Sequence, residues 1–352
     1  MSRLLARPGA TFRCFGDGLC CTDVHQLGPV TRSEKVALDR HAAGATTRIA
    51  GLVLLRLSDD ARPGGCHFLD AEMGCRIHTH DARPRTCHRF PYLLVRTPDG
   101  LRLGTDHRCP CRTMFDRTES APIDVARAEA ALLDRAGRLS TDRAIEGRVP
   151  IAARRRVGWT RYLAIEAELL ASLARASAQN PVESILGVDP FPEIEVGTWE
   201  QIGVDLAMET RASRWGECFR LFGRTLAWLH CPPDERPRRL AFAPRLWQES
   251  FDRAERRTPF DAARADDVIE AMYADFVADF VWGLEWTYAC DMTQLRIELC
   301  SRLAVARTFA RALVRSGARP DRACAESIAM IEVVGVSPAW MSIAGRCSAA
   351  VP

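Results

Sequence analysis

The sequence has almost no lysine, no long apolar run and no apolar segment near its start. Lys35 is the single lysine among 48 basic residues, so the basic groups near any site are planar, permanently charged guanidiniums. No run of about eighteen apolar residues occurs, which argues against a membrane-spanning helix. The first fourteen residues lack the apolar core of a secretory signal. We therefore expect a cytoplasmic protein with no membrane partner.

Common catalytic motifs are also missing. No G-x-G-x-x-G, Walker, G-x-S-x-G or H-E-x-x-H pattern occurs, so hydride transfer, nucleotide hydrolysis and the usual hydrolase mechanisms lack support. The C-x-x-x-C-x-x-C signature of radical S-adenosylmethionine enzymes is absent as well. A net charge of +3 from 48 basic and 45 acidic residues argues against a nucleic-acid partner. The 352 residues, 47% of them hydrophobic, nevertheless suffice for a large buried core.

Cysteine, in contrast, is concentrated in the first third of the sequence. Eight cysteines fall within the first 111 positions, namely Cys14, Cys20, Cys21, Cys66, Cys75, Cys87, Cys109 and Cys111. In a reducing compartment, thiolates grouped in this way favour metal ligation over disulfides. We interpret all eight as candidate metal ligands.

The cysteine pattern leaves the number and kind of centres open. Cys20 and Cys21 are adjacent, and adjacent side chains rarely point at one metal, so one of the pair is a candidate for a second site. Eight thiolates are enough for two four-coordinate sites, or for one site with spare cysteines. The chemistry favours either a 4Fe-4S cluster or zinc. His88, next to Cys87, is the foremost histidine candidate, and Arg83, Arg85 and Arg89 either offset thiolate charge or form a solvated face.

The chain divides into two parts of different composition. Residues 1–118 hold the cysteines and seven of the eight histidines, and we expect there a small metal-organised α+β domain. Thr31 and Glu34 predict a capping box for a helix near 32–42, Leu52 to Leu55 suit a strand, and residues 92–103 read as a β-hairpin.

Residues 119–352 show helical periodicity and predict a helical bundle, so the fold class is mainly α. A short strand is considered at 331–336. The expected helices are 126–139, 159–176, 215–229, 240–254, 268–281 and 295–313.

Four segments of the cysteine region carry a family resemblance. CFGDGLCC, CHFL, GCRIH and RPRTCHRFP, between residues 12 and 111, resemble the YkgJ-type cysteine-cluster family of zinc- or iron-chelating domains. The layout, a cysteine cluster followed by a helical remainder, is similar to that of the flagellin lysine N-methylases (FliB). That similarity implies protein lysine methylation with an iron-sulfur centre, S-adenosylmethionine as cofactor and a protein substrate as partner. Redox chemistry and a non-catalytic, zinc-stapled interaction module are the alternatives.

Overall fold

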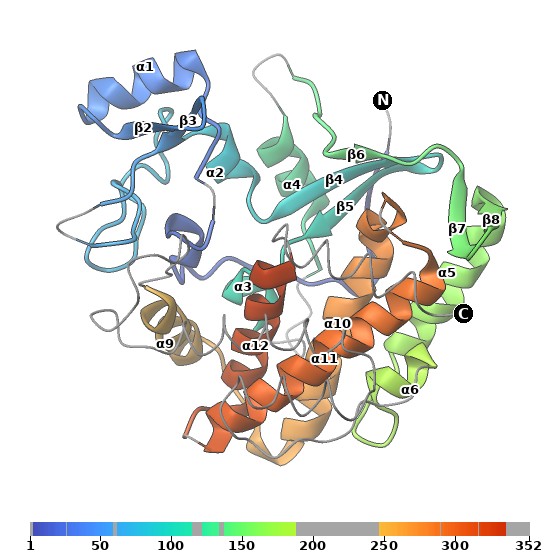
Figure 1. The fold of residues 1–352 in the computed structure, drawn as a ribbon. Coiled ribbons are helices and arrows are strands. Elements are labelled where there is room, and N and C mark those ends of the chain that lie inside the picture. The colour runs from blue at the N-terminus through green and yellow to red at the C-terminus, as the bar shows by residue number, and fades with distance from the viewer. Residues whose placement is uncertain are drawn as a thin grey trace.

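The protein is an α+β structure in which mixed sheets come first and a helical region follows. The computed structural model describes residues 3–25, 27–58, 62–114, 122–133, 137–187, 246–288, 290–315 and 317–335. Figure 1 shows the long helices gathered on one side of the molecule and the strands on the other. No described helix is both long enough and apolar enough to cross a membrane.

A four-stranded sheet lies at the centre of the strand-bearing side, in the order β1-β5-β4-β6. The predicted hairpin is confirmed: β4 and β5 pair antiparallel, with Tyr92 opposite Thr105. β1 runs parallel to β5, and β6 runs parallel to β4. Gly100 is required here, because a Cβ at this position would lie 2.7 Å from the carbonyl oxygen of Arg3. The four strands are β1 (Leu4–Ala6), β4 (Tyr92–Thr97), β5 (Gly100–Thr105) and β6 (Arg143–Ala144).

A smaller lobe contains α1 (Arg32–His41) and the hairpin of β2 (Thr46–Ile49) and β3 (Leu52–Leu55). The capping box predicted for this helix is confirmed: Glu34 N donates to Thr31 Oγ1 over 3.3 Å and Thr31 N donates to Glu34 Oε2 over 2.8 Å. The other oxygen of Glu34 accepts from the backbone N–H of Arg85 at 2.8 Å. Glu34 thereby joins α1 to α2 (Arg85–Arg89), the helix that carries Cys87.

The helical region follows the apolar stripes read from the sequence. The stripes at 159–176, 268–281 and 295–313 lie in α5, α10 and α11, and the stripe at 126–139 lies partly in the shorter α4. The strand considered at 331–336 is wrong, because residues up to 335 continue α12. The helix expected at 215–229 lies outside the described residues. The helices are α4 (Val125–Leu132), α5 (Trp159–Leu173), α6 (Val182–Leu186), α9 (Trp247–Arg257), α10 (Ala265–Gly283), α11 (Met292–Arg315) and α12 (Pro320–Gly335).

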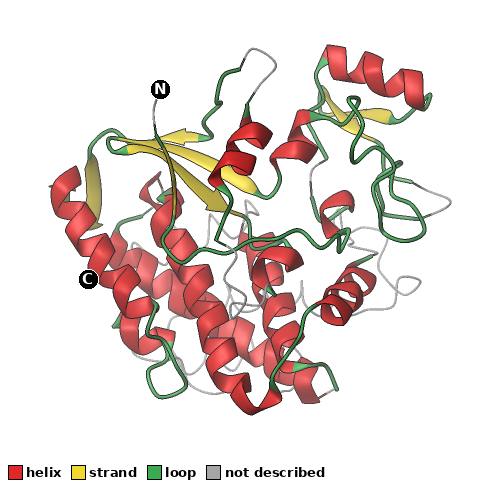
Figure 2. Ribbon diagram, turned by 180° about the vertical axis from the view of Figure 1, so that it is seen from behind, coloured by secondary structure: helices red, strands yellow, loops and turns green. Residues whose placement is uncertain are grey.

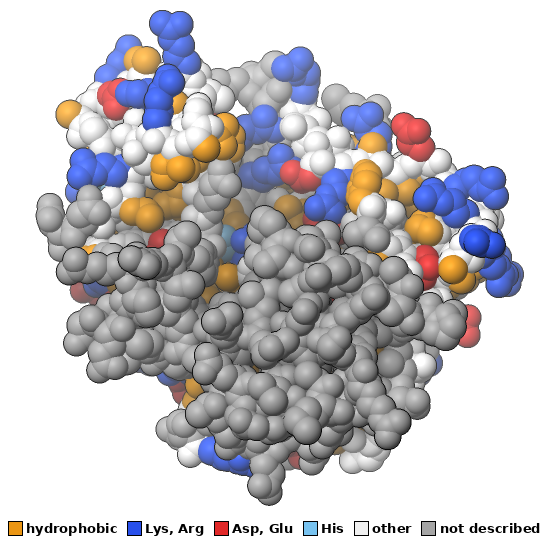
Figure 3. Space-filling model, in the orientation of Figure 1, with side chains coloured by type: hydrophobic (Ala, Val, Ile, Leu, Met, Phe, Trp, Pro, Cys, Tyr) orange, Lys and Arg blue, Asp and Glu red, His pale blue; other side chains and the backbone are white. Residues whose placement is uncertain are grey.

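A third hairpin precedes α5 and was not expected from the sequence. β7 (Arg148–Ala152) pairs antiparallel with β8 (Arg155–Gly158), and a bulge interrupts the pairing between Pro150 and Ala152. Its segment is rich in arginine, with Arg154, Arg155 and Arg156 exposed, and arginine is not a typical strand residue. Figure 3 shows basic side chains both over this hairpin and over the lobe that contains α1.

Buried ion pairs fasten the central sheet to the helices. The guanidinium of Arg102, on β5, donates to both oxygens of Glu166 on α5 at 2.6 and 2.9 Å, and it lies 4.8 and 4.2 Å from the rings of Trp159 and Trp282. Pairing and stacking together satisfy a charge that is almost wholly removed from water. Seen from behind in Figure 2, the long helices lie below the strands.

A further ion-pair network joins β1, the segment after β5 and helix α10. Arg7 and Arg112 both bind Asp275 and Asp279, and His107 lies 3.0 Å from Asp279. All five side chains are buried. Because an unpaired buried charge is strongly destabilising, this network fixes the position of the segment that contains Arg112.

Candidate metal centre

Two of the predicted ligands lie on a one-turn helix after the central sheet. Cys109 precedes α3 (Pro110–Thr113), and Cys111 lies within it. Pro110 occupies the first helical position, where its missing N–H removes no hydrogen bond. The next residue, Arg112, is anchored to Asp275 and Asp279 on α10. The two thiols are therefore held on a short but well-fixed element.

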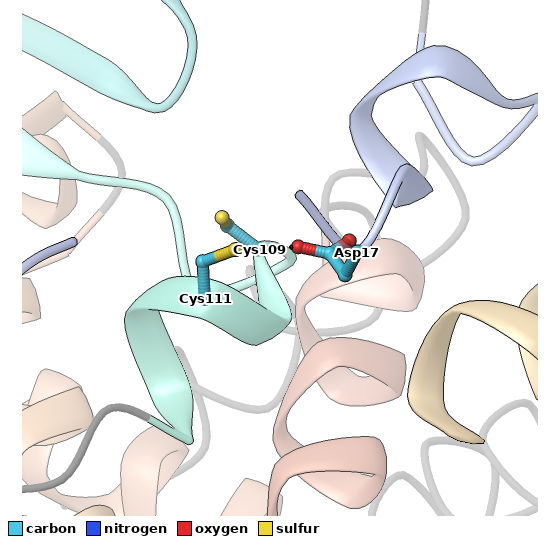
Figure 4. A group of neighbouring side chains, drawn as sticks. All are labelled: Asp17, Cys109 and Cys111. Carbon is cyan, nitrogen blue, oxygen red and sulfur yellow. Dashed lines mark hydrogen bonds between the residues drawn. The ribbon is translucent and has the colours of Figure 1, made fainter. Parts of the chain in front are cut away.

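Asp17 approaches these thiols from the N-terminal loop. Its Oδ1 accepts from the backbone N–H of Leu19 at 2.8 Å, and its Oδ2 accepts from the Cys111 thiol at 2.7 Å. Figure 4 shows the carboxylate of Asp17 directed at the two cysteines. Gly18 makes this turn possible, because it has φ +83° and a Cβ would lie 2.8 Å from the carbonyl oxygen of Met73.

The three side chains together have the geometry of a small-ion site. One ligand atom from each of Asp17, Cys109 and Cys111 lies within 4.8 Å of the others. Ligands of a tetrahedral zinc ion are about 3.8 Å apart, given a zinc–sulfur bond of about 2.3 Å. Among the described residues, no other group of three or more potential ligands meets this criterion. The buried group could therefore hold a metal ion.

Cys14 supplies a fourth candidate ligand beside this group. The neighbouring Cys111 thiol is the main cause that raises the pKa of Cys14, and the Phe15 N–H points at the Cys111 sulfur over 3.3 Å. Cys14 is exposed, whereas Asp17, Cys109 and Cys111 are 3%, 6% and 0% exposed. We call Cys14, Asp17, Cys109 and Cys111 the Asp17 set. Three of its four residues are buried, and the fourth, Cys14, is accessible to solvent.

Electrostatics at the Asp17 set favour a cation. Burial raises the pKa of Asp17, raises that of Cys109 to about 11, and raises that of Cys111 well above its usual value. No arginine or lysine in the described ranges forms an ion pair with Asp17. A divalent cation would replace the thiol protons and supply the missing positive charge.

The other five predicted cysteines gather in the neighbouring lobe. We call Cys20, Cys21, Cys66, Cys75 and Cys87 the five-cysteine set. The Cys20 and Cys21 sulfurs are 3.9 Å apart. Cys66 is buried in the apolar core of this lobe, and Cys21, Cys75 and Cys87 pack against that core. The charge of Cys20 contributes to raising the pKa of Cys109, which belongs to the Asp17 set. All eight predicted cysteines are free thiols, and none of them forms a disulfide. They fall into two sets, the Asp17 set and the five-cysteine set.

The thiols of the five-cysteine set differ in acidity. Burial raises the pKa of Cys66 and of Cys87 to about 12. The neighbouring thiols of Cys20 and then Cys75 raise the pKa of Cys21, while the Cys21 thiol lowers that of Cys75 to about 6. Cys75 therefore ionises more readily near neutral pH than Cys66 or Cys87.

The three arginines expected around Cys87 have different positions. Arg83 stays close, donating to the carbonyl oxygen of Cys87 over 2.6 Å and lowering the pKa of Cys75 and Cys87 through its charge. Arg85 donates to the carbonyl oxygen of Leu132, and Arg89 pairs with Asp142. Arg83 is thus the one of the three that bonds to the backbone of a predicted ligand residue, Cys87.

The histidines contribute nothing to the Asp17 set in the part of the chain that the structure describes. His107 is buried against Asp279 instead of facing the thiols. His88, the foremost candidate, lies on α2, where burial lowers its pKa. Its role as a ligand stays a prediction.

Comparisons with known proteins give no relative. No family model matches the chain, no curated protein matches it, and no solved structure matches it. The resemblance to cysteine-cluster proteins therefore rests on the four sequence motifs alone. The site has to be judged from its own geometry.

Proposed function

We propose that this chain is a metal-binding protein in which the Asp17 set holds a single zinc ion. The observation that carries the proposal is the convergence of Asp17, Cys109 and Cys111 within 4.8 Å in a buried position. Three thiolates and one carboxylate are common zinc donors, and four protein ligands are typical of a structural zinc site.

The position of the site supports a structural role, in which the metal would join the N-terminal loop to α3. Leu19, two residues after Asp17, and Met114, just after α3, belong to the same apolar core as helices α9 to α12. The side chain of Arg257, on α9, donates to the carbonyl oxygen of Phe15. A zinc ion at the Asp17 set would fasten the N-terminal loop to α3 where both meet the helices. This favours metal-dependent order, with free energy of folding supplied by metal binding.

Methyl transfer to protein lysine is a further proposal, which the FliB resemblance implies and no described contact yet supports. Incubation of the full chain with labelled S-adenosylmethionine and candidate lysine-bearing proteins tests it. Transfer of label to a protein would establish an enzyme. No transfer and no binding of the cofactor would leave the interaction module as the better account.

The experiment for zinc is elemental analysis of the full chain after purification and dialysis. We expect zinc bound in at least a one-to-one ratio in the wild type, and one equivalent less in Cys111→Ser. Cys300→Ser is the matched control, since Cys300 is also buried but lies outside both cysteine sets. Wild-type protein without metal, or full retention of zinc by Cys111→Ser, would contradict the proposal.

A further inference from the structure

We propose that the groove between α1 and the turn at residues 80–82 binds a short acidic peptide segment of a partner protein. The groove has a volume of about 940 Å³, and no residue of the Asp17 set lines it. This volume lies within the range of about 300–1,000 Å³ that is typical of ligand sites. The inference goes beyond the proposed function, because it concerns a different surface and a peptide in place of a metal ion.

Two rows of side chains on α1 form one wall of the groove. Residues four apart lie one above the other on the same face of a helix. In the first row Val36 is 48% exposed, and an arginine stands four residues away on either side of it. At a rise of about 1.5 Å per residue, these two arginines are about 12 Å apart along the helix. The rows are Arg32, Val36 and Arg40, and Ser33, Ala37 and His41.

The two arginines of this wall form no ion pair in the described parts of the chain. Both oxygens of Glu34, on the same helix, already accept hydrogen bonds from backbone N–H groups at 2.8 Å. Lys35 and Asp39 pair with each other. Asp81, on the opposite wall, is the one acid among the described residues that line the groove. Two guanidiniums against one carboxylate leave a net positive charge, which favours an anionic ligand.

His80 lies opposite His41 and adds a hydrogen-bond donor to the groove. The two rings meet edge to face, with centroids 3.8 Å apart and planes at 75°. The N–H of Ala82 donates to His80 Nδ1 over 3.0 Å, so the neutral ring carries its proton on Nε2. This Nε2–H is then the donor that His80 can offer to a carboxylate. Figure 3 shows basic and hydrophobic side chains side by side on the lobe that contains α1.

The spacing of these features favours an extended peptide. An extended chain advances about 3.3 Å per residue, so acidic residues four apart are about 13 Å apart, which matches the two arginines. Side chains alternate in an extended chain, so the residue midway between the acids points the same way as they do and would meet Val36. The expected pattern is acid-x-apolar-x-acid. A free phosphate ion is too small to reach both arginines and offers Val36 no apolar contact.

The test is fluorescence anisotropy of a labelled peptide, Glu-Ser-Leu-Ser-Glu with blocked ends, titrated with the full chain. We expect saturable binding that weakens as salt is added. The double variant Arg32→Gln/Arg40→Gln removes both charges but keeps good helix formers, and should weaken binding by about fivefold or more. Val36→Ser should weaken it by a smaller factor. Arg161→Gln is the matched control, since Arg161 is exposed on α5, which lies on the other side of the molecule.

Two further ligands make the test selective. The peptide Lys-Ser-Leu-Ser-Lys should not bind, and inorganic phosphate in equal amount should not displace the acidic peptide. Equal binding of both peptides, displacement by phosphate, or unchanged binding by the double arginine variant would overturn the proposal, as would no binding by the wild type at millimolar concentration. Zinc content should be the same in all of these variants. Peptide binding by protein without zinc would therefore overturn the metal proposal alone.

Discussion

The Cys111 thiol donates a hydrogen bond of 2.7 Å to Oδ2 of Asp17, a residue 94 positions earlier in the chain. Asp17→Asn keeps an oxygen for the Leu19 N–H but removes the anionic ligand. We expect zinc affinity to fall by about 100-fold or more, measured by competition with a chromophoric chelator. Asp39→Asn, which alters an exposed pair with Lys35, is the control. Equal affinities in the two variants would remove Asp17 from the site.

Removal of metal should make stability sensitive to alkaline pH. Burial raises the pKa of Cys109 from 9.0 to about 11, so without metal the unfolded chain releases this proton first. The contribution of this thiol is therefore complete below pH 9 and is lost as pH rises toward 11. Denaturant midpoints of chelator-treated and metal-loaded protein at pH 8 and 10 check this. A decline of the same size in both forms would contradict it.

Substitution of Gly18 should lower stability for two reasons, its positive φ and its close approach to Met73. A second glycine with nearly the same φ but open space separates the two effects. Gly18→Ala places a Cβ on a backbone with φ +83° and only 2.8 Å from the Met73 carbonyl oxygen. Gly147→Ala has nearly the same φ, +81°, with nothing within 4 Å. We expect a loss of about 1 kcal/mol in the free energy of unfolding for Gly147→Ala, and a larger loss with weakened zinc binding for Gly18→Ala. Identical behaviour would show that crowding at Gly18 is absent.

Arg102 tests how tightly the sheet is joined to the helices. Lysine retains the charge but loses the paired hydrogen bonds to Glu166 and the contacts with Trp159 and Trp282. We expect Arg102→Lys to lower the free energy of unfolding by about 2 kcal/mol or more. Arg96→Lys, at an exposed position on the adjacent strand, should change it by less than about 0.5 kcal/mol. Urea denaturation followed by circular dichroism compares them.

Ionisation of the buried Glu326 carboxyl should lower the free energy of unfolding as the pH rises toward 7. Burial raises its pKa from 4.5 to about 7, although Trp247 and Gln248 donate to its Oε1 at 2.7 and 3.1 Å. The unfolded chain therefore loses this proton at lower pH, and the contribution of Glu326 declines from pH 4.5 to 7. Glu326→Gln should gain about 2–3 kcal/mol relative to wild type between pH 4.5 and 8. A difference independent of pH would refute the assignment.

Local signals in the sequence predicted local structure well. The capping box at Thr31 and Glu34, the hairpin around Gly100 and the stripe of α10 all depend on nearby residues, and all are present. The hairpin at 148–158 was missed because exposed arginines occupy the positions where strands usually carry β-branched side chains.

The site was predictable only in part. Cysteine content identified the region, but the composition of the site depends on contacts between segments far apart in the chain, such as Cys111 with Asp17. Asp17 was not predicted, because the cysteine pattern alone was used to choose candidate ligands. Its position between Gly16 and Gly18, both with positive φ, is the signal that could have identified it.

The pairing of Arg7 with α10 has a consequence for how the chain matures. Arg7 leaves the ribosome before its partners Asp275 and Asp279, which follow 268 and 272 residues later. Until they emerge, neither Arg7 nor Arg112 has a counter-charge with which to be buried. Strand β1 and the α3 turn therefore cannot reach their final packing until α10 has been made. If the Asp17 set binds zinc as proposed, binding through Cys109 and Cys111 would follow the synthesis of α10.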